Sequence, residues 1–148
     1  MKNLIFPVLI IIFTFNISLA NAHEHSESKK IVSAFFDLAF VQRKPIEAAN
    51  KYISPNKYIQ HNPETADGRE AFIKSFAAYV EKTSYQCQIK HVIADSDIVA
   101  VHSLCKESAK DLGSAVVDIF RIEHNLIVEH WDVQQATPIK SANKNTMF

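Results

Sequence analysis

The sequence predicts an α+β domain in which helices come first and an antiparallel sheet follows. Apolar residues recur at three- and four-residue intervals over 28–43 and again over 68–82, which is the spacing of one face of an amphipathic helix. From 85 to 133 the chain instead contains runs rich in Val, Ile and Phe separated by short polar turns, as in β-hairpins. Helices that precede a run of strands are expected to cover one face of the sheet.

Proline and glycine positions divide the helical part into three elements. The first helix is expected over 28–43, and a second, shorter helix over 45–52 begins with a proline, which suits a first helical turn. A third helix is expected over 68–82, with Asp67 as its N-cap. Residues 58–63 should be extended, because a proline at the end of this stretch disfavours helical geometry before it.

Four strands are expected in two hairpins. The first pairs 85–93 with 98–106, the second pairs 115–122 with 126–133, and 107–114 is the looser connection. A curved sheet covered by helices forms a cone. Its mouth is a natural site for a small molecule, because apolar walls with a few polar groups are typical of ligand pockets.

The first 22 residues have the pattern of a signal peptide. A short positive start precedes an apolar run over 4–20, and Ala20-Asn21-Ala22 fits the small-x-small rule for cleavage. A membrane anchor is the alternative, but a proline and several polar residues interrupt the run, and no stop-transfer charge cluster follows. We therefore expect a signal peptide over 1–22, a domain over 23–138 and a flexible tail over 139–148. The mature protein should be periplasmic or secreted, without a membrane anchor.

Composition excludes several classes of function. The 16 basic and 16 acidic residues balance and form no basic cluster, so nucleic-acid binding is not expected. Only two glycines are present, whereas phosphate-binding loops and dinucleotide fingerprints need several. His23, Glu24 and His25 could hold a metal loosely, but a mobile new terminus is the preferred interpretation, and no metal site is predicted.

The two cysteines could form a disulfide in an exported protein. A two-residue turn at Asp95-Ser96 would place Cys87 opposite Leu104, with the two sulfurs on opposite faces. A three-residue turn would place Cys87 directly opposite Cys105 and allow a bridge. A disulfide and two buried free thiols therefore both remain open.

Asp118 is the most informative polar residue of the second hairpin. A carboxylate among Val, Ile and Phe either faces water or lies in a cavity, where it can act as an acid or a base. A two-residue turn, the preferred interpretation, places Asp118 opposite Trp131 and on the same face as Phe120 and Glu129. A three-residue turn would instead place it opposite His130.

The preferred register turns His130 and Asp132 toward the other face of the sheet. There they would face a helix or a second subunit. Val117, Ile119 and Val128 would join His130 on a partly apolar outer surface. Monomers seldom leave such a surface exposed, so a homodimer is expected.

Five stretches together resemble the SnoaL-like polyketide cyclases, a family within the NTF2-like superfamily of cone-shaped α+β barrels. They are YIQHNP at 58–63, DG at 67–68, VIADSDIVAVHS at 92–103, VVDIFR at 116–121 and IVEHWDV at 127–133. The resemblance covers roughly residues 28–138, and the order and spacing of the five stretches make it stronger than any one motif. It implies a curved antiparallel sheet covered by the N-terminal helices.

The resemblance also implies chemistry without a metal or an organic cofactor. In these cyclases an aspartate on a long strand acts as acid and base in an intramolecular aldol condensation, with a strand histidine nearby. Asp118 and His102 stand at comparable places here. Such a step needs a base beside the carbonyl and a donor for the developing oxyanion. The expected pocket walls are Tyr58, His61, Phe120, Glu129, His130 and Trp131.

Two hypotheses about function remain open at this stage. The first is an exported cyclase, isomerase or lyase that acts on a small apolar carbonyl compound through Asp118 and His102. The second is a protein that binds an apolar ligand or dimerises without turnover, because one superfamily fold serves enzymes, ligand binders and association modules. The second hypothesis predicts a cavity lined almost wholly by apolar groups. Each proposed catalytic residue also has a structural alternative, in which Asp118 is a solvent-facing or interface carboxylate and His102 a hydrogen-bonded core residue.

Overall fold

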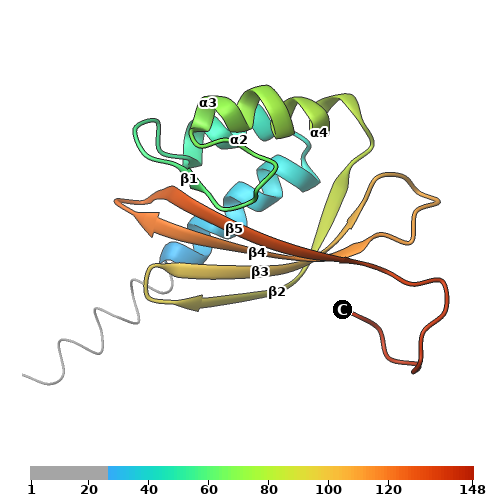
Figure 1. The fold of residues 1–148 in the computed structure, drawn as a ribbon. Coiled ribbons are helices and arrows are strands. Elements are labelled where there is room, and N and C mark those ends of the chain that lie inside the picture. Colours follow the sequence, from blue (N-terminus) through green and yellow to red (C-terminus); the bar gives the residue numbers. More distant parts are fainter. Residues whose placement is uncertain (1–26) are drawn as a thin grey trace, which may run out of the picture.

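The computed structural model describes residues 27–148, and Figure 1 shows their fold. The predicted signal peptide over 1–22 and the histidines near the expected cleavage point lie outside the described residues. Between residues 27 and 148, no helix is long and apolar enough to cross a membrane.

The three expected helices are present, and two of them contain a π-helical segment. Residues 27–36 are α-helical and run directly into η1 (Asp37–Val41). Helix α2 (Pro45–Tyr52) follows with its proline in the first turn. The third helix is continuous and consists of α3 (Arg69–Phe72), η2 (Ile73–Ala77) and α4 (Ala78–Lys82).

Asp67 does not cap the third helix as expected. Gly68 takes the N-cap position with a φ of 98°, and no side chain caps this end. The Asp67 carboxylate instead accepts a hydrogen bond of 2.8 Å from the backbone N–H of Gln60. Asp67 therefore holds the extended segment at 58–63 rather than the helix.

The sheet has five strands in the order β1-β5-β4-β3-β2. Their bounds are β1 (Ile59–Gln60), β2 (Gln86–Asp95), β3 (Ile98–Lys106), β4 (Ser114–Glu123) and β5 (Leu126–Ala136). The four long strands are antiparallel, as predicted. Strand β1 adds a short parallel edge beside β5, so the sheet is mixed. Two residues are too few to give a periodic signal, which is why the sequence did not predict this strand.

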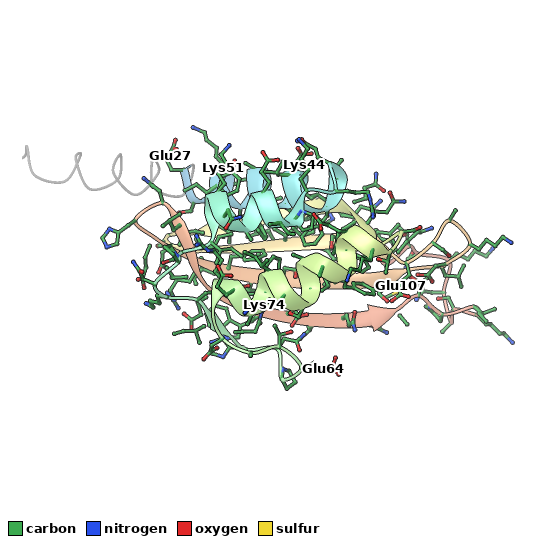
Figure 2. All side chains as sticks on the ribbon, turned by 90° about the horizontal axis from the view of Figure 1, so that it is seen from above. Glu27, Lys44, Lys51, Glu64, Lys74 and Glu107 are labelled. Atoms are coloured by element: carbon green, nitrogen blue, oxygen red, sulfur yellow. A yellow bond between two sulfur atoms is a disulfide. The ribbon has the colours of Figure 1, made fainter. Side chains whose placement is uncertain are left out.

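The helices cover one face of the sheet, and the core lies between these two layers (Figure 1). The largest fully buried side chains come from both layers and include Phe35, Phe36, Ile53, Val99, Val101 and Ile127. The outer side of the helical layer is polar, and Figure 2 shows Lys44, Lys51 and Lys74 there. After β5 the chain passes to the uncovered side of the sheet, where Phe148 stacks on His102.

The two cysteines form a disulfide, which was one of the two open alternatives. Cys87 and Cys105 are direct partners on β2 and β3. The route to this register differs from the predicted one, because the turn has two residues, between Asp95 and Ile98. A β-bulge between Ile89 and His91 then shifts the register by one residue and brings the cysteines together.

A second bulge changes the register of the β4–β5 hairpin. The turn at His124 and Asn125 has two residues with positive φ, as preferred from the sequence. An irregularity between Arg121 and Ile122 then shifts the pairing, so Asp118 lies opposite Asp132. Both predicted registers, with Asp118 opposite Trp131 or opposite His130, are therefore wrong.

The shifted register also reverses the predicted faces of β5. His130 and Asp132 face the helices together with Asp118, whereas Glu129 and Trp131 lie on the uncovered face. The predicted outer surface containing Val128 and His130 is thus incorrect, because Val128 is buried within the chain and His130 lines a cavity.

Candidate active site

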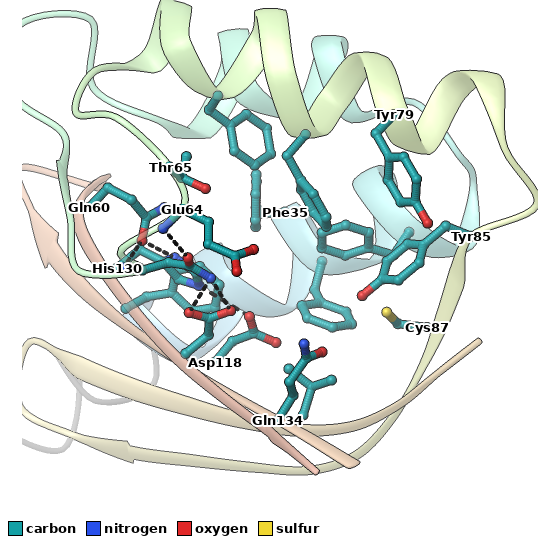
Figure 3. Close-up of a pocket in the computed structure, with 18 of the residues that line it drawn as sticks. Phe35, Gln60, Glu64, Thr65, Tyr79, Tyr85, Cys87, Asp118, His130 and Gln134 are labelled. Carbon is teal, nitrogen blue, oxygen red and sulfur yellow. Dashed lines mark hydrogen bonds and ion pairs between the residues drawn. The ribbon is translucent and has the colours of Figure 1, made fainter. Parts of the chain in front are cut away.

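A cavity of about 280 Å³ lies between the helical layer and the sheet (Figure 3). Its apolar wall consists of the rings of Phe35, Phe36, Phe40, Phe72, Phe76 and Phe120. These rings contact one another edge-on or tilted; for example, the centroids of Phe35 and Phe120 are 5.8 Å apart in an edge-on contact. Such a wall favours an apolar or aromatic ligand.

Each π-helical segment supplies one phenylalanine to this wall. Phe40 comes from η1 and Phe76 from η2, and their ring centroids are 5.9 Å apart. A π-helical turn has one more residue than an α-helical turn, so it changes which side chains face the sheet. The two segments therefore bring bulky rings over the cavity.

Asp118 and His130 form an ion pair or hydrogen bond at one end of the cavity. Asp118 Oδ1 lies 3.1 Å from His130 Nε2, and the two side chains are 16% and 13% exposed. The residues come from neighbouring strands β4 and β5. Figure 3 shows both side chains on the same side of the cavity.

The hydrogen bonds of Gln60 determine where the proton on His130 lies. Gln60 Oε1 accepts a 3.0 Å hydrogen bond from the backbone N–H of Asn62, which fixes the orientation of the amide. The same oxygen lies 2.9 Å from His130 Nδ1, so Nδ1 must carry a hydrogen. His130 Nε2, on the other side of the ring, then lies 3.1 Å from Asp118 Oδ1.

Asp132 is held in the same way by Asn62. The side-chain oxygen of Asn62 accepts a 2.8 Å hydrogen bond from the backbone N–H of Glu64, so its amide nitrogen must point the other way. That nitrogen lies 2.9 and 3.0 Å from the two oxygens of Asp132. The extended segment at 58–63 thus positions the polar groups of both β5 residues.

Tyr58 supplies a hydroxyl group to this end of the cavity. The residue is 5% exposed and lines the cavity. Burial, together with the negative charges of Asp118 and Asp132, raises the pKa of the Tyr58 phenol above its ordinary value of 10.0. The phenol therefore stays protonated near neutral pH and can donate a hydrogen bond to an oxygen of a ligand.

His102 does not lie in the cavity and is not near Asp118 as expected. Its strand neighbours Val101 and Ser103 are fully buried on the inner side, so His102 must point outward. Its ring stacks on His91 with 5.6 Å between centroids, and on Phe148 with 5.8 Å. The histidine that contacts Asp118 is His130.

Three further predicted wall residues gather on the outer face of the sheet. The rings of His61 and Trp131 are stacked with 4.5 Å between centroids. Glu129 accepts hydrogen bonds of 2.8 Å from both His61 and Arg121. Burial would raise the pKa of Glu129, but the hydrogen bonds and charges of His61 and Arg121 lower it below its ordinary value. These residues form a polar cluster that lies outside the cavity.

Of the predicted site residues, Asp118, Tyr58, Phe120 and His130 line the cavity. Sequence reasoning missed Gln60 and Asn62, and it turned Asp132 to the wrong face. A usable signal was present, because Gln60 and Asn62 are two residues apart in an extended segment and must share a face. Within residues 27–148, no group of three or more His, Cys, Asp or Glu side chains is placed to hold a metal ion.

Comparisons with known proteins agree with the observed architecture. Residues 32–130 match the family model of the SnoaL-like domain. No curated protein sequence matches the chain. Among solved structures, a candidate SnoaL-like polyketide cyclase from Jannaschia sp. CCS1 is similar, with a TM-score of 0.64 and 15% identity over 75% of this chain and 87% of that chain.

Two other structures show the same likeness at low identity. A candidate ketosteroid isomerase from Kribbella flavida has a TM-score of 0.63 and 12% identity over 81% of this chain and 86% of that one. An NTF2-like protein of unknown function from Mesorhizobium loti has a TM-score of 0.64 and 16% identity over 76% of this chain and 94% of that one. The family match covers more than half of the sequence, and the fold agrees with it. This chain therefore belongs to the SnoaL-like domain family and has an NTF2-like fold.

Proposed function

We propose that the cavity binds a small, largely apolar carbonyl compound, and that Asp118 and His130 catalyse proton transfer beside its carbonyl group. The reaction would be an aldol-type cyclisation or an isomerisation. The observation that carries this proposal is the 3.1 Å contact between the partly buried side chains of Asp118 and His130 at the polar end of an aromatic cavity.

The arrangement supplies the groups that such a reaction needs. The contact with His130 uses Asp118 Oδ1, and Asp118 Oδ2 has no hydrogen-bond donor within the described part of the chain. This oxygen can take a proton from the carbon beside the carbonyl, which leaves an enolate. The Tyr58 hydroxyl, held protonated, can donate a hydrogen bond to the enolate oxygen. Asp118 then returns the proton to another carbon, or the enolate attacks a second carbonyl and the resulting alkoxide takes the proton from Asp118.

The names of the structural relatives support this class of reaction. One is named as a candidate polyketide cyclase and one as a candidate ketosteroid isomerase. At 12–15% identity these relatives share the fold with this chain. The reaction is therefore proposed from the residues in the cavity.

Hydrogen exchange at a carbon beside a carbonyl tests the proposal without knowledge of the natural substrate. Cyclohex-2-enone in heavy water serves as the probe, and its exchange is followed by proton NMR. We expect exchange above the buffer rate, with Asp118→Asn and His130→Gln each reducing the enzymatic part roughly 100- to 10,000-fold. His102→Gln is the matched control, because His102 lies outside the cavity.

A wild-type protein that binds the ketone but does not exchange its hydrogens would overturn the catalytic proposal. It would favour the alternative function, a ligand-binding module without turnover. Equal losses in His130→Gln and His102→Gln would also contradict the assigned roles.

We also propose that the protein is exported and works in an oxidising compartment, either periplasmic or extracellular. The leader pattern over 1–22 and the disulfide between Cys87 and Cys105 support this. Amino-terminal sequencing of protein recovered from the periplasm or medium should give His23 as the first residue. Recovery of an uncleaved chain from the cytoplasm would contradict it.

A further inference from the structure

The cavity has a second end, opposite the pair formed by Asp118 and His130. Figure 3 shows Tyr79, Tyr85 and Cys87 there, with the Tyr85 hydroxyl directed toward the interior and the Tyr79 hydroxyl directed toward Tyr85. The ring centroids of Tyr79 and Tyr85 are 5.8 Å apart, and that of Phe76 lies 5.6 Å from Tyr85 and 6.2 Å from Tyr79. Three aromatic rings therefore surround this end.

This end, called the tyrosine end below, also carries a carboxylate. Glu107 lines the cavity beside the tyrosines, and Glu64, Asp118 and Asp132 line it elsewhere, whereas its lining includes no Lys or Arg. Among residues 27–148, the only ion pair formed by these four carboxylates is the one between Asp118 and His130. The lining of the cavity is thus negative overall.

The negative potential contributes to raised pKa values of two tyrosines that line the cavity. Burial and the charges of Asp118, Asp132 and Glu107 contribute to a raised pKa of Tyr85. Burial, a hydrogen bond to Glu107 and the charge of Glu107 likewise raise the pKa of Tyr79. An anionic ligand would be repelled by the same field, and a cation would be attracted.

The tyrosine end is held in place by Arg43. Its guanidinium donates hydrogen bonds of 2.5 Å to the carbonyl of Tyr85 and 2.7 Å to that of Val80. A third donor bonds the carbonyl of Thr83. These bonds fix the loop between α4 and β2, and the Arg43 side chain is not part of the cavity lining. The positions of the two rings are therefore preorganised.

There is also room for a ligand to extend past the tyrosines. A second hollow of about 400 Å³ adjoins the cavity and shares Tyr85, Glu107 and Gln134 with it. Its remaining walls are polar and comprise Cys105, Ser108, Asp111 and Ser114.

We propose that Tyr79, Tyr85 and Glu107 form a subsite for a cationic group, an amine or a quaternary ammonium, carried by the ligand of this cavity. Aromatic faces and a carboxylate are the groups that attract such cations. The subsite refines the proposed function, since it assigns the substrate class to carbonyl compounds that also carry a positive charge at their far end. Ligands with a carboxylate or phosphate at that end are excluded.

The test compares choline with 3,3-dimethylbutan-1-ol, a neutral molecule of the same shape. Binding is followed through the NMR resonances of the tyrosine rings at low ionic strength, with ring assignments taken from Tyr79→Phe and Tyr85→Phe. We expect saturable shifts at Tyr79 and Tyr85, with a Kd for choline about tenfold below that of the neutral isostere. Glu107→Gln should reduce this ratio to about twofold or less. Tyr85→Leu should weaken choline binding while leaving the fold intact by circular dichroism.

Glu81→Gln is the matched control, because Glu81 is an exposed glutamate of α4 outside the cavity lining. It should keep the full preference for choline. Equal Kd values for the two probes, a preference that survives Glu107→Gln, or no saturable shift at these rings would each overturn the subsite.

The subsite and the proposed catalysis fail separately. A choline preference without hydrogen exchange on cyclohex-2-enone would leave the subsite standing and remove the catalytic proposal. Hydrogen exchange without a preference for choline would remove the subsite and leave the catalytic proposal standing. Asp118→Asn should abolish exchange and retain most of the preference for choline.

Discussion

Asp118 and Asp132 lie directly opposite one another on β4 and β5, and both face the cavity. Two like charges on paired strand positions normally destabilise a sheet. Here each carboxylate has its own partner, His130 for Asp118 and Asn62 for Asp132. The bulge between Arg121 and Ile122 creates this arrangement, because it shifts the pairing of the two strands by one residue.

Removing the charge of Asp118 should separate stability from activity. Asp118→Asn keeps the shape and can donate a hydrogen bond to His130, while the repulsion from Asp132 is relieved. We expect the free energy of unfolding at pH 7 to stay within about 0.5 kcal/mol of wild type or to rise. Urea unfolding measures this, and a loss above about 1 kcal/mol would show that the charge is needed for folding.

Asp132→Ala, in contrast to Asp118→Asn, should lower the free energy of unfolding. It leaves the partly buried amide nitrogen of Asn62 without its acceptor, so we expect a loss of about 1–3 kcal/mol. The double variant Asn62→Ala/Asp132→Ala provides the comparison, since it removes both partners and should lose less than the sum of the single changes. Additive losses would contradict a direct coupling between these residues.

Glu129 should make stability depend on pH in the acid range. Its pKa is lower in the folded chain than its ordinary value of 4.5. Its contribution is therefore fully present above about pH 4.5 and is lost as the pH falls through the lower folded-state value. Between pH 6 and pH 3, Glu129→Gln should lose less stability than wild type in urea unfolding.

The matched control for this measurement is Glu123→Gln. Glu123 pairs with Lys57 at 2.7 Å, but its side chain is 40% exposed, compared with 16% for Glu129. An exposed pair adds little, so Glu123→Gln should follow the wild-type pH profile. Identical profiles for all three proteins would rule out a special contribution of Glu129.

The disulfide should stabilise the domain and protect the tyrosine end of the cavity. Cys87 and Cys105 are 18 positions apart, and Cys87 lines the cavity. Cys87→Ser/Cys105→Ser should lose about 2–4 kcal/mol relative to the oxidised wild type. Thiol labelling of wild type should require both unfolding and a reductant, and labelling after unfolding alone would contradict the bond.

We further propose that the uncovered face of the sheet forms a homodimer. One row across this face consists of Ile93, Ala100, Ile119 and Trp131. Ile93 on β2 and Val133 on β5 are 68% and 67% exposed. Sedimentation at micromolar concentration should show a dimer for wild type and a monomer for Val133→Glu. Val41→Glu, at an exposed position outside the sheet, should stay dimeric, and a monomeric wild type would refute the proposal.

The sequence by itself determined the order of the three helices and the four long strands, favoured the two-residue turn at His124 and Asn125, and indicated the family. The order of the elements and the turn follow from local signals, namely helical spacing, alternating strands and residues that tolerate a positive φ. The family follows from the resemblance of five sequence stretches. It also placed Asp118, Tyr58 and Phe120 among the candidate site residues, and all three line the cavity.

The tertiary structure decided which residues meet. One extra residue at each bulge reverses the face of every side chain beyond it, because strand side chains alternate with a period of two. The bulge between Ile89 and His91 joined Cys87 to Cys105 despite a two-residue turn. The bulge between Arg121 and Ile122 turned His130 and Asp132 into the cavity, and His130 became the partner of Asp118. The positions of bulges depend on the packing of neighbouring strands and helices. The periodic pattern of apolar residues along the chain therefore does not predict them.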